Sequence, residues 1–340
     1  MLDNQKEWTI RDLAAMLNLS VATVSRALND DDNVRPQTKK RVSELVERVG
    51  YRVNDHAKKL RNGQSGIIGC IVPRLDCQWM SAVVSGIESA TRRQEYSLIV
   101  MQSNGIYETE VECADMLFTK RVEGVVVSLS GEKTDLGHLR RFIRKDIPVV
   151  LLDPACSDQG FVNIVIDDAR AGYDLTRHLL SLGRRRILHL SGQSKGRTVT
   201  GGCDGYRQAY AEAGLPVREQ YIMACGLSRQ DGITAAEMVL RWPEKPDAII
   251  APSDHCAIGC MTALKMRGVR IPEEIAVAGS GNDPVSMLSE PNLTTMGYPG
   301  QRMGETAINH LMHRLQGTAA GNAISTIILR RELILRRSTS

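Results

Sequence analysis

A short run near the start of the chain combines side chains that can bind DNA bases and the phosphates beside them. In the segment SVATVSRALN, 20–29, Thr23, Ser25 and Arg26 alternate with small or apolar residues. Hydroxyls can bond phosphate oxygens, small side chains permit close approach, and an arginine can pair through two hydrogen bonds with guanine. The segment therefore predicts binding in the major groove of DNA, and the alternative is an ordinary helical hairpin at a domain edge.

Two helices joined by a tight turn would position these side chains. Thr9 followed by Asp12 fits a capping box that starts a first helix, and apolar residues then recur at helical spacing up to Leu17. The pair Asn18-Leu19 is expected to end that helix, and Ser20 to cap the second. In the second helix Val21, Val24 and Leu28 point one way, and Ala22, Thr23, Ser25 and Arg26 point elsewhere.

A third helix and a concentration of positive charge follow. Pro36 suits the first position of a helix and Gly50 its end, with apolar residues at helical spacing between them. From residue 33 to residue 61 nine Lys or Arg residues face three acidic ones, a surplus of six, although the whole chain carries only +4. Neutralisation of DNA phosphates explains this placement. The run 30–32 of three aspartates predicts a solvated loop, with no role assigned.

The rest of the chain predicts two α/β lobes. After a headpiece of roughly 60 residues, about 280 remain, enough for two ordinary domains. Near-continuous apolar runs separated by helical patterns indicate parallel sheets covered on both faces, with a ligand cleft at the carboxyl ends of the strands. The expected strands are 66–73, 96–103, 123–130, 148–154, 162–167, 186–192, 248–254 and 274–281.

Motifs of other functional classes are missing from the sequence. No phosphate-binding glycine loop is present, and the eight cysteines and seven histidines lack the spacing of zinc sites or disulfides. We therefore expect no metal and no cofactor. The N-terminal residues lack the apolar region of a signal peptide, and no membrane span is found, which favours a cytoplasmic protein. An α/β enzyme using His255 beside Asp254 is a rival interpretation, but it needs a nucleophile or cofactor loop that we do not find.

The chain resembles bacterial transcription regulators of the lactose-repressor (LacI) family over essentially its full length. The match includes TVSRALN at 23–29, the pair Gly50-Tyr51, and Asn54, Ala57 and Leu60. The resemblance implies a small all-α headpiece at 1–62 with a hinge helix at about 54–61, which enters the minor groove when DNA is bound. There Leu60 would be the wedge that partly unstacks a base step. Val53 stands where the family usually has proline, which leaves the start of the hinge less sharply defined.

The resemblance also implies an effector-binding and dimerisation core at 63–340, with the two-lobed architecture of periplasmic sugar-binding proteins. The first lobe is expected at about 64–165 and 298–322, and the second at about 166–297 and 323–340. No leucine-heptad tail follows Arg337, which argues against tail-mediated tetramers.

Contacts to DNA carry over from the family residue by residue. The base contacts would come from Val21, Ala22 and Arg26, and Arg26 should dominate because the other two offer only apolar contact. The expected backbone contacts are Thr9, Ser20, Thr23, Ser25 and Asn29, of which Thr9 and Ser20 also serve as helix caps.

The ligand cleft departs from the family pattern at two charged positions. Relatives commonly anchor a ligand through an arginine where Gly202 stands, and through an aspartate where Gly281 stands. Without both anchors we expect the cleft to bind something other than a typical free monosaccharide, or to bind one weakly. The residues expected to line it are Trp79, Asp153, Tyr206, Ser253, Asp254, Asn282 and Tyr298, with Trp79 the best single candidate.

The implied function is a sequence-specific regulator, more often a repressor, that binds a pseudo-palindromic double-stranded DNA operator as a homodimer. A small-molecule effector, for which a carbohydrate-derived molecule is one candidate, would control it from the cleft. The sequence leaves open whether the effector releases DNA or promotes binding. The main rival is a solute-binding receptor without a regulatory role, which leaves residues 9–29 without a use.

Overall fold

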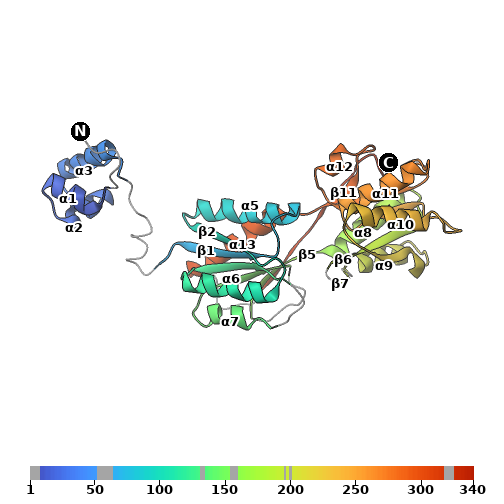
Figure 1. The fold of residues 1–340 in the computed structure, drawn as a ribbon, viewed down its shortest axis with the longest axis horizontal. Coiled ribbons are helices and arrows are strands. Elements are labelled where there is room, and N and C mark those ends of the chain that lie inside the picture. Colours follow the sequence, from blue (N-terminus) through green and yellow to red (C-terminus); the bar gives the residue numbers. More distant parts are fainter. Residues whose placement is uncertain are drawn as a thin grey trace. The chain divides into compact units, whose positions relative to one another are not determined.

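A computed structural model describes residues 8–51, 64–130, 135–153, 160–194, 197–198, 201–317 and 325–340. The chain divides into two units, Met1–Ser65 and Gly66–Ser340 (Figure 1). The boundary thus follows Ser65, whereas the sequence placed it after residue 62. Each unit is described by itself below.

In the described residues of the first unit there are three short helices, whose ends follow local sequence signals. They are α1 (Ile10–Leu17), α2 (Val21–Leu28) and α3 (Pro36–Val49). Thr9 and Asp12 form the predicted capping box of α1, and Ser20 accepts a hydrogen bond from the amide of Thr23 to cap α2. Helix α3 begins at Pro36 and is capped after Val49 by Gly50, whose backbone is left-handed, a conformation that glycine adopts without strain. These predictions are confirmed.

The three helices share one small apolar core. Its buried members are Leu13, Ala14, Val24, Val42 and Leu45. A core of this size excludes little apolar surface from water, so helix caps matter more here than in a large domain. The headpiece therefore depends on both the caps and the five buried side chains.

The first lobe of the second unit is a parallel sheet covered on both faces. The sheet order is β12-β5-β4-β3-β1-β2. Alternate residues of β1 serve opposite cores: Ile68 packs with one group of helices and Ile71 with the other. The strands are β1 (Ile67–Val72), β2 (Ser97–Gln102), β3 (Gly124–Ser128), β4 (Val149–Leu152), β5 (Val162–Ile166) and β12 (Thr326–Leu329). The helices are α5 (Gln78–Arg93) and α13 (Gly300–Leu315) on one face, and α6 (Tyr107–Thr119) and α7 (Gly137–Ile143) on the other.

The second lobe is also a sheet covered by helices on both faces, but one of its edge strands is antiparallel. Its main path is β13-β11-β10-β9-β6-β7, and β8 also pairs with β6. The pairings among β6, β8, β9, β10 and β11 are parallel, and β13 runs antiparallel to β11. The strands are β6 (Ile187–Ser194), β7 (Arg197–Thr198), β8 (Ile222–Cys225), β9 (Ala248–Ile250), β10 (Ala276–Gly281), β11 (Thr294–Gly297) and β13 (Glu332–Ile334). The helices are α8 (Asp168–Ser181), α9 (Gly201–Glu212), α10 (Arg229–Val239), α11 (Asp254–Met266) and α12 (Val285–Leu288), with a 3-10 turn η1 (Glu219–Tyr221).

The chain passes between the two sheets three times, after β5, after β11 and after β12. Strand β12 pairs with β5 in the first sheet, with Thr326 opposite Asn163. The sequence assignment of 323–340 to the second lobe is therefore wrong for residues 326–329. A four-residue strand carries no local signal of which sheet it joins, because long-range pairing decides this. The final strand, β13, does join the second sheet as predicted.

Helix pairs in both lobes approach so closely that glycine is required at the contact. A Cβ built on Gly205 of α9 would lie 1.8 Å from the carbonyl oxygen of Ala169 in α8. A Cβ on Gly172 of α8 would lie 2.2 Å from the carbonyl oxygen of Gly202. The same reciprocal arrangement recurs between α5 and α13 at Gly86 and Gly304, and between α10 and α11 at Gly232 and Gly259.

Candidate DNA-binding surface and ligand-binding region

Helix α2 presents the predicted base-reading residues on its accessible side. Val24 is buried in the headpiece core, whereas Ala22 and Arg26 are exposed. Val21 shares the side of Val24 in the helical pattern, yet it is 42% exposed because it is the first residue of the helix. All three side chains are thus available to a partner, and their contacts with bases remain predictions.

The residues predicted to contact the DNA backbone already have local hydrogen bonds. The Ser20 and Thr23 hydroxyls lie 2.8 Å apart, and the Thr9 hydroxyl donates to Asp12 Oδ2 at 2.6 Å. The Asn29 side-chain amide donates to the Ser25 carbonyl oxygen at 2.8 Å. These bonds fix the two ends of α2 and the start of α1. Contact with phosphate would come in addition to this capping role.

The acidic loop after α2 is structured by its own side chains, although the sequence assigned it no role. Lys39 Nζ donates to the Asp30 carbonyl oxygen at 2.9 Å and to its carboxylate at 2.7 Å, which ties α3 to the loop. Backbone and side-chain N–H groups of Asn33 bond the Asp31 carboxylate and lower its pKa. One basic residue is thereby engaged by an acid of the loop, while Arg26, Arg35 and Arg48 remain exposed.

The predicted minor-groove residues Asn54, Ala57 and Leu60 lie outside the described residues, as does the whole hinge segment 54–61.

Three of the predicted ligand-binding residues lie close together: the aromatic pair Trp79 and Tyr298, and Asp153 beside Tyr298. The rings of Trp79 and Tyr298 are 5.1 Å apart between centroids, at 50°. Burial raises the pKa of the Tyr298 phenol well above 10, and the nearby carboxylates of Asp153 and Asp168 raise it further. The guanidinium carbon of Arg331 lies 5.5 Å from the centre of the Tyr298 ring. Sequence reasoning missed Asp168 and Arg331.

Asp254 is a buried structural residue at the carboxyl edge of the second sheet. It is 0% exposed, and its carboxylate accepts the Thr295 hydroxyl at 2.5 Å and the Asp283 amide at 2.7 Å. Burial raises the pKa of this carboxyl group, while the two hydrogen bonds oppose the shift. His255 pairs with Asp283 at 3.3 Å between Nδ1 and Oδ2. The structure therefore offers no hydrogen bond from His255 to Asp254 of the kind the enzyme interpretation needs.

Three further candidates are occupied by contacts within the second lobe. The Ser253 hydroxyl donates to the Leu227 carbonyl oxygen at 2.6 Å, and Asn282 Oδ1 accepts from Arg336 at 2.7 Å. Tyr206 is 1% exposed, and its hydroxyl donates to the Ile187 carbonyl oxygen at 2.9 Å. The expectation that Tyr206 lines a cleft does not fit this position, because its ring packs in the core against His189.

The two positions without charged anchors have different surroundings. A Cβ on Gly202 would meet only the His189 ring, at 3.4 Å. A Cβ on Gly281 would lie 3.4 Å from Asp283 Oδ2 and 3.5 Å from Asp254 Oδ2. Asp283 thus brings a carboxylate next to position 281, where the resemblance implies an anchoring aspartate. Its position two residues after Gly281 was the signal that sequence reasoning overlooked.

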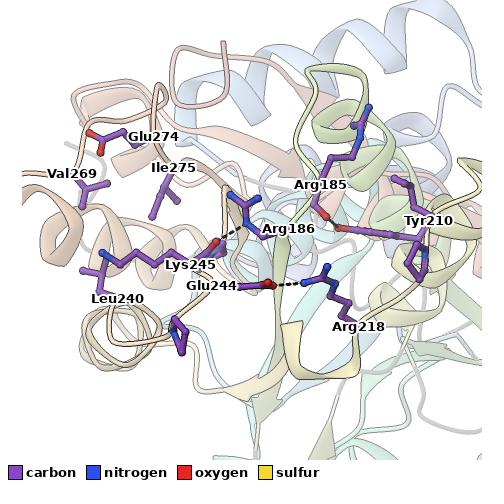
Figure 2. Close-up of a pocket in the computed structure, with 14 residues that line it drawn as sticks. Arg185, Arg186, Tyr210, Arg218, Leu240, Glu244, Lys245, Val269, Glu274 and Ile275 are labelled. Atoms are coloured by element: carbon purple, nitrogen blue, oxygen red, sulfur yellow. Dashed lines mark hydrogen bonds and ion pairs between the residues drawn. The ribbon is translucent and has the colours of Figure 1, made fainter.

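A cavity of about 620 Å³ opens at the opposite end of the second lobe, before strands β6, β9 and β10 (Figure 2). It is lined by four basic side chains together with apolar ones such as Leu240 and Ile275. The basic residues are Arg185, Arg186, Arg218 and Lys245. Arg218 pairs with Glu244, and Arg186 Nε donates to the Lys245 carbonyl oxygen at 2.8 Å. None of the seven predicted ligand-binding residues lines this cavity.

Within the described ranges, no group of three or more His, Cys, Asp or Glu side chains is arranged to hold a metal ion. No helix in the same part of the chain is long and apolar enough to cross a bilayer.

The headpiece has the helix-turn-helix arrangement, with an accessible second helix. The two doubly wound lobes, between which the chain passes three times, form a periplasmic-binding-protein core. Together they define the class of DNA-binding regulators built on such a core. Residues 9–54 match the family "Bacterial regulatory proteins, lacI family". Residues 65–336 match "Periplasmic binding proteins and sugar binding domain of LacI family". The chain belongs to the LacI family.

Curated relatives and solved structures agree with this assignment. The chain is 30% identical to catabolite control protein A of Priestia megaterium, over 97% of this chain and 99% of that protein. It is 31% identical to the HTH-type transcriptional repressor PurR of Vibrio cholerae, over 91% of each. The fold matches the lac repressor dimer bound to operator and the anti-inducer ONPF, with a TM-score of 0.83 at 23% identity, over 98% of this chain and 99% of that one.

Proposed function

We propose that this protein is a transcriptional repressor that binds a pseudo-palindromic operator as a homodimer and responds to a small molecule. The observation that carries the proposal is the exposed side of α2, where Ala22 and Arg26 stand free of the headpiece core. Two copies of such a helix, one turn of DNA apart, would read two half-sites. The protein would act in the cytoplasm, where the bacterial chromosome lies.

The effector is proposed to be a polar, carbohydrate-derived molecule rather than a plain hexose. The Trp79–Tyr298 pair offers aromatic faces on which a sugar ring can stack. Beside it lie the carboxylates of Asp153 and Asp168, which can accept hydrogen bonds. The second lobe adds the Asp283 carboxylate next to Gly281. It lacks the arginine that would hold an anionic or polyol ligand through two parallel hydrogen bonds at position 202.

Selection of bound fragments from the source genome by the full-length protein tests DNA recognition. We expect a near-palindrome to be enriched, with a flexible central step at which a hinge could bend the duplex. The Arg26→Ala variant run in parallel should lose preference at one base pair of each half-site. No enriched sequence, with or without cell extract to supply a co-ligand, would overturn the proposal and favour the solute-binding receptor.

Calorimetry with a panel of free and substituted sugars tests the effector. We expect weak or no binding of plain hexoses, because two charged anchors of relatives are glycines here. Tight binding of an unmodified hexose would contradict the proposed ligand class without affecting the DNA-binding proposal.

A further inference from the structure

Arg331 lies in one of the three connections between the lobes and bonds to the other two. It follows β12, in the third connection. Its Nη1 donates to Asp168 Oδ1 at 3.0 Å, at the first connection, where α8 begins. Its Nη2 donates to the Met296 carbonyl oxygen at 2.8 Å and its Nε to that of Gly297 at 3.3 Å, where β11 enters the second connection.

The guanidinium group is almost fully used by these contacts. Nη2 also donates to the Ser280 hydroxyl at 2.5 Å, at the end of β10. Four of the five N–H donors of an arginine are therefore engaged within the protein. The Arg331 side chain is only 9% exposed. It is thus poorly placed to be a ligand anchor and well placed to hold the connections.

The same side chain contacts the aromatic pair of the ligand-binding region. Its guanidinium lies over the Tyr298 ring, and that ring packs on Trp79 of α5 in the first lobe. One backbone hydrogen bond supports the arrangement: the Asp167 amide donates to the Leu329 carbonyl oxygen at 3.0 Å, joining the first and third connections.

We propose that Arg331 is a positioning residue that ties the three connections together and couples them to the Trp79–Tyr298 pair. A molecule that moves the aromatic pair would then act on all three connections at once. If it binds one arrangement of the two lobes more tightly than another, it shifts the equilibrium toward that arrangement. The inference rests on the proposed function for its regulatory meaning. Its physical content can be tested without any ligand or DNA.

Hydrogen exchange of the full chain, without DNA or small molecule, tests the tie. In Arg331→Gln we expect amides in 166–171 and 294–300 to exchange about tenfold faster or more, because charge-assisted hydrogen bonds on both segments are lost. Arg331→Lys keeps the charge beside Asp168 but not the planar set of donors. Its amide exchange rates should therefore fall between those of wild type and those of Arg331→Gln. The matched control is Arg330→Gln, at the exposed neighbouring arginine, which should leave both segments unchanged.

Coupling to the aromatic pair is tested by a double-mutant cycle. Trp79→Ala should speed exchange at 166–171, a segment on the other side of Arg331, and should add nothing further in the Arg331→Gln background. Faster exchange confined to 329–333, or strictly additive effects of the two substitutions, would overturn the inference. If Arg331→Gln does not fold, Asp168→Asn removes the ion pair while keeping an oxygen acceptor, and the same pattern is expected.

The two proposals fail separately. Failure of the wild-type protein to select any operator would remove the proposed function and leave the exchange result intact. Unchanged exchange in a wild-type-like operator binder would remove only the role of Arg331.

Discussion

Arg26 is the only basic side chain of α2, and it stands exposed near the end of that helix. Arg26→Ala should weaken binding to the true operator by about 1–3 kcal/mol, roughly fivefold to 150-fold, and relax the preference at one base pair. Fluorescence anisotropy on the operator and on single-base variants measures both effects. As a control, Arg48→Ala removes an exposed arginine at the end of α3 and should weaken all sequences alike or not at all. Unchanged base preference in Arg26→Ala would refute its assignment.

His189 predicts a pH dependence of stability. Burial, with a smaller effect of Arg207, lowers the pKa of His189 to about 4. An unfolded histidine has a pKa of about 6.5, so the stability from keeping this ring neutral is complete above that pH and is lost as pH falls toward 4. At pH 4.5 the loss from this residue should be about 2–3 kcal/mol relative to pH 7.5.

Chemical denaturation of wild type and His189→Phe at the two pH values measures this loss. Phenylalanine can keep the stacking on Tyr206, and the Nδ1 atom it replaces has no hydrogen-bond partner among the described residues. The pKa values of His178 and His310 are also lowered by burial, so wild type should lose more than this one contribution. The difference between the two proteins in the loss of unfolding free energy isolates the contribution of His189. Equal losses would show that the His189 ring can be protonated inside the folded protein.

Residue-scale prediction from sequence succeeded where a role depends on near neighbours. Thr9 with Asp12, Ser20 and Gly50 are helix caps because of residues one turn away. It failed for Tyr206 and Arg331, whose environments come from distant segments: Tyr206 bonds Ile187, and Arg331 bonds residues 34 or more positions earlier. No spacing rule encodes such contacts.

At the scale of elements, strands that lie in a long apolar run of sequence could be predicted, and most strands without such a run could not. All eight expected runs contain a strand of the structure. Strands β7, β8, β11 and β12 were missed, because they do not lie in a long apolar run and their pairing depends on the rest of the sheet. The assignment of residues 326–329 to the second lobe was wrong for the same reason.

The α8–α9 contact gives a prediction at this scale. Gly205→Ala forces a methyl group against the Ala169 carbonyl, so the helices must separate, at a cost of about 1–3 kcal/mol or more. Gly202→Ala, on the same helix, meets only the edge of His189 at an ordinary distance and should change stability by less than about 0.5 kcal/mol. Urea denaturation compares the two variants. Equal stabilities would mean that the helix pair can adjust and that close packing is not required.

Charge at the scale of the whole molecule predicts a steep response to salt. A net charge of only +4 is distributed so that the headpiece and hinge sequence carry the excess. If a dimer neutralises six to ten phosphates, operator affinity should fall by about 10³–10⁵ between 50 and 200 mM salt. Anisotropy titrations across this range give the slope. Replacing Arg35 and Arg48 with glutamine should make the slope shallower, whereas a flat response would exclude binding through phosphate contacts.

The order in which the chain builds its lobes has a genetic consequence. Helix α13 and strand β12 belong to the first lobe but are encoded after most of the second. A stop codon anywhere between β5 and β12 therefore leaves the first sheet without its edge strand, and one before α13 also removes a covering helix. Even late nonsense alleles should thus abolish both lobes together. In such a truncated product the headpiece, whose core is complete by residue 51, should still fold, but it would lack the core proposed to hold two copies on one operator.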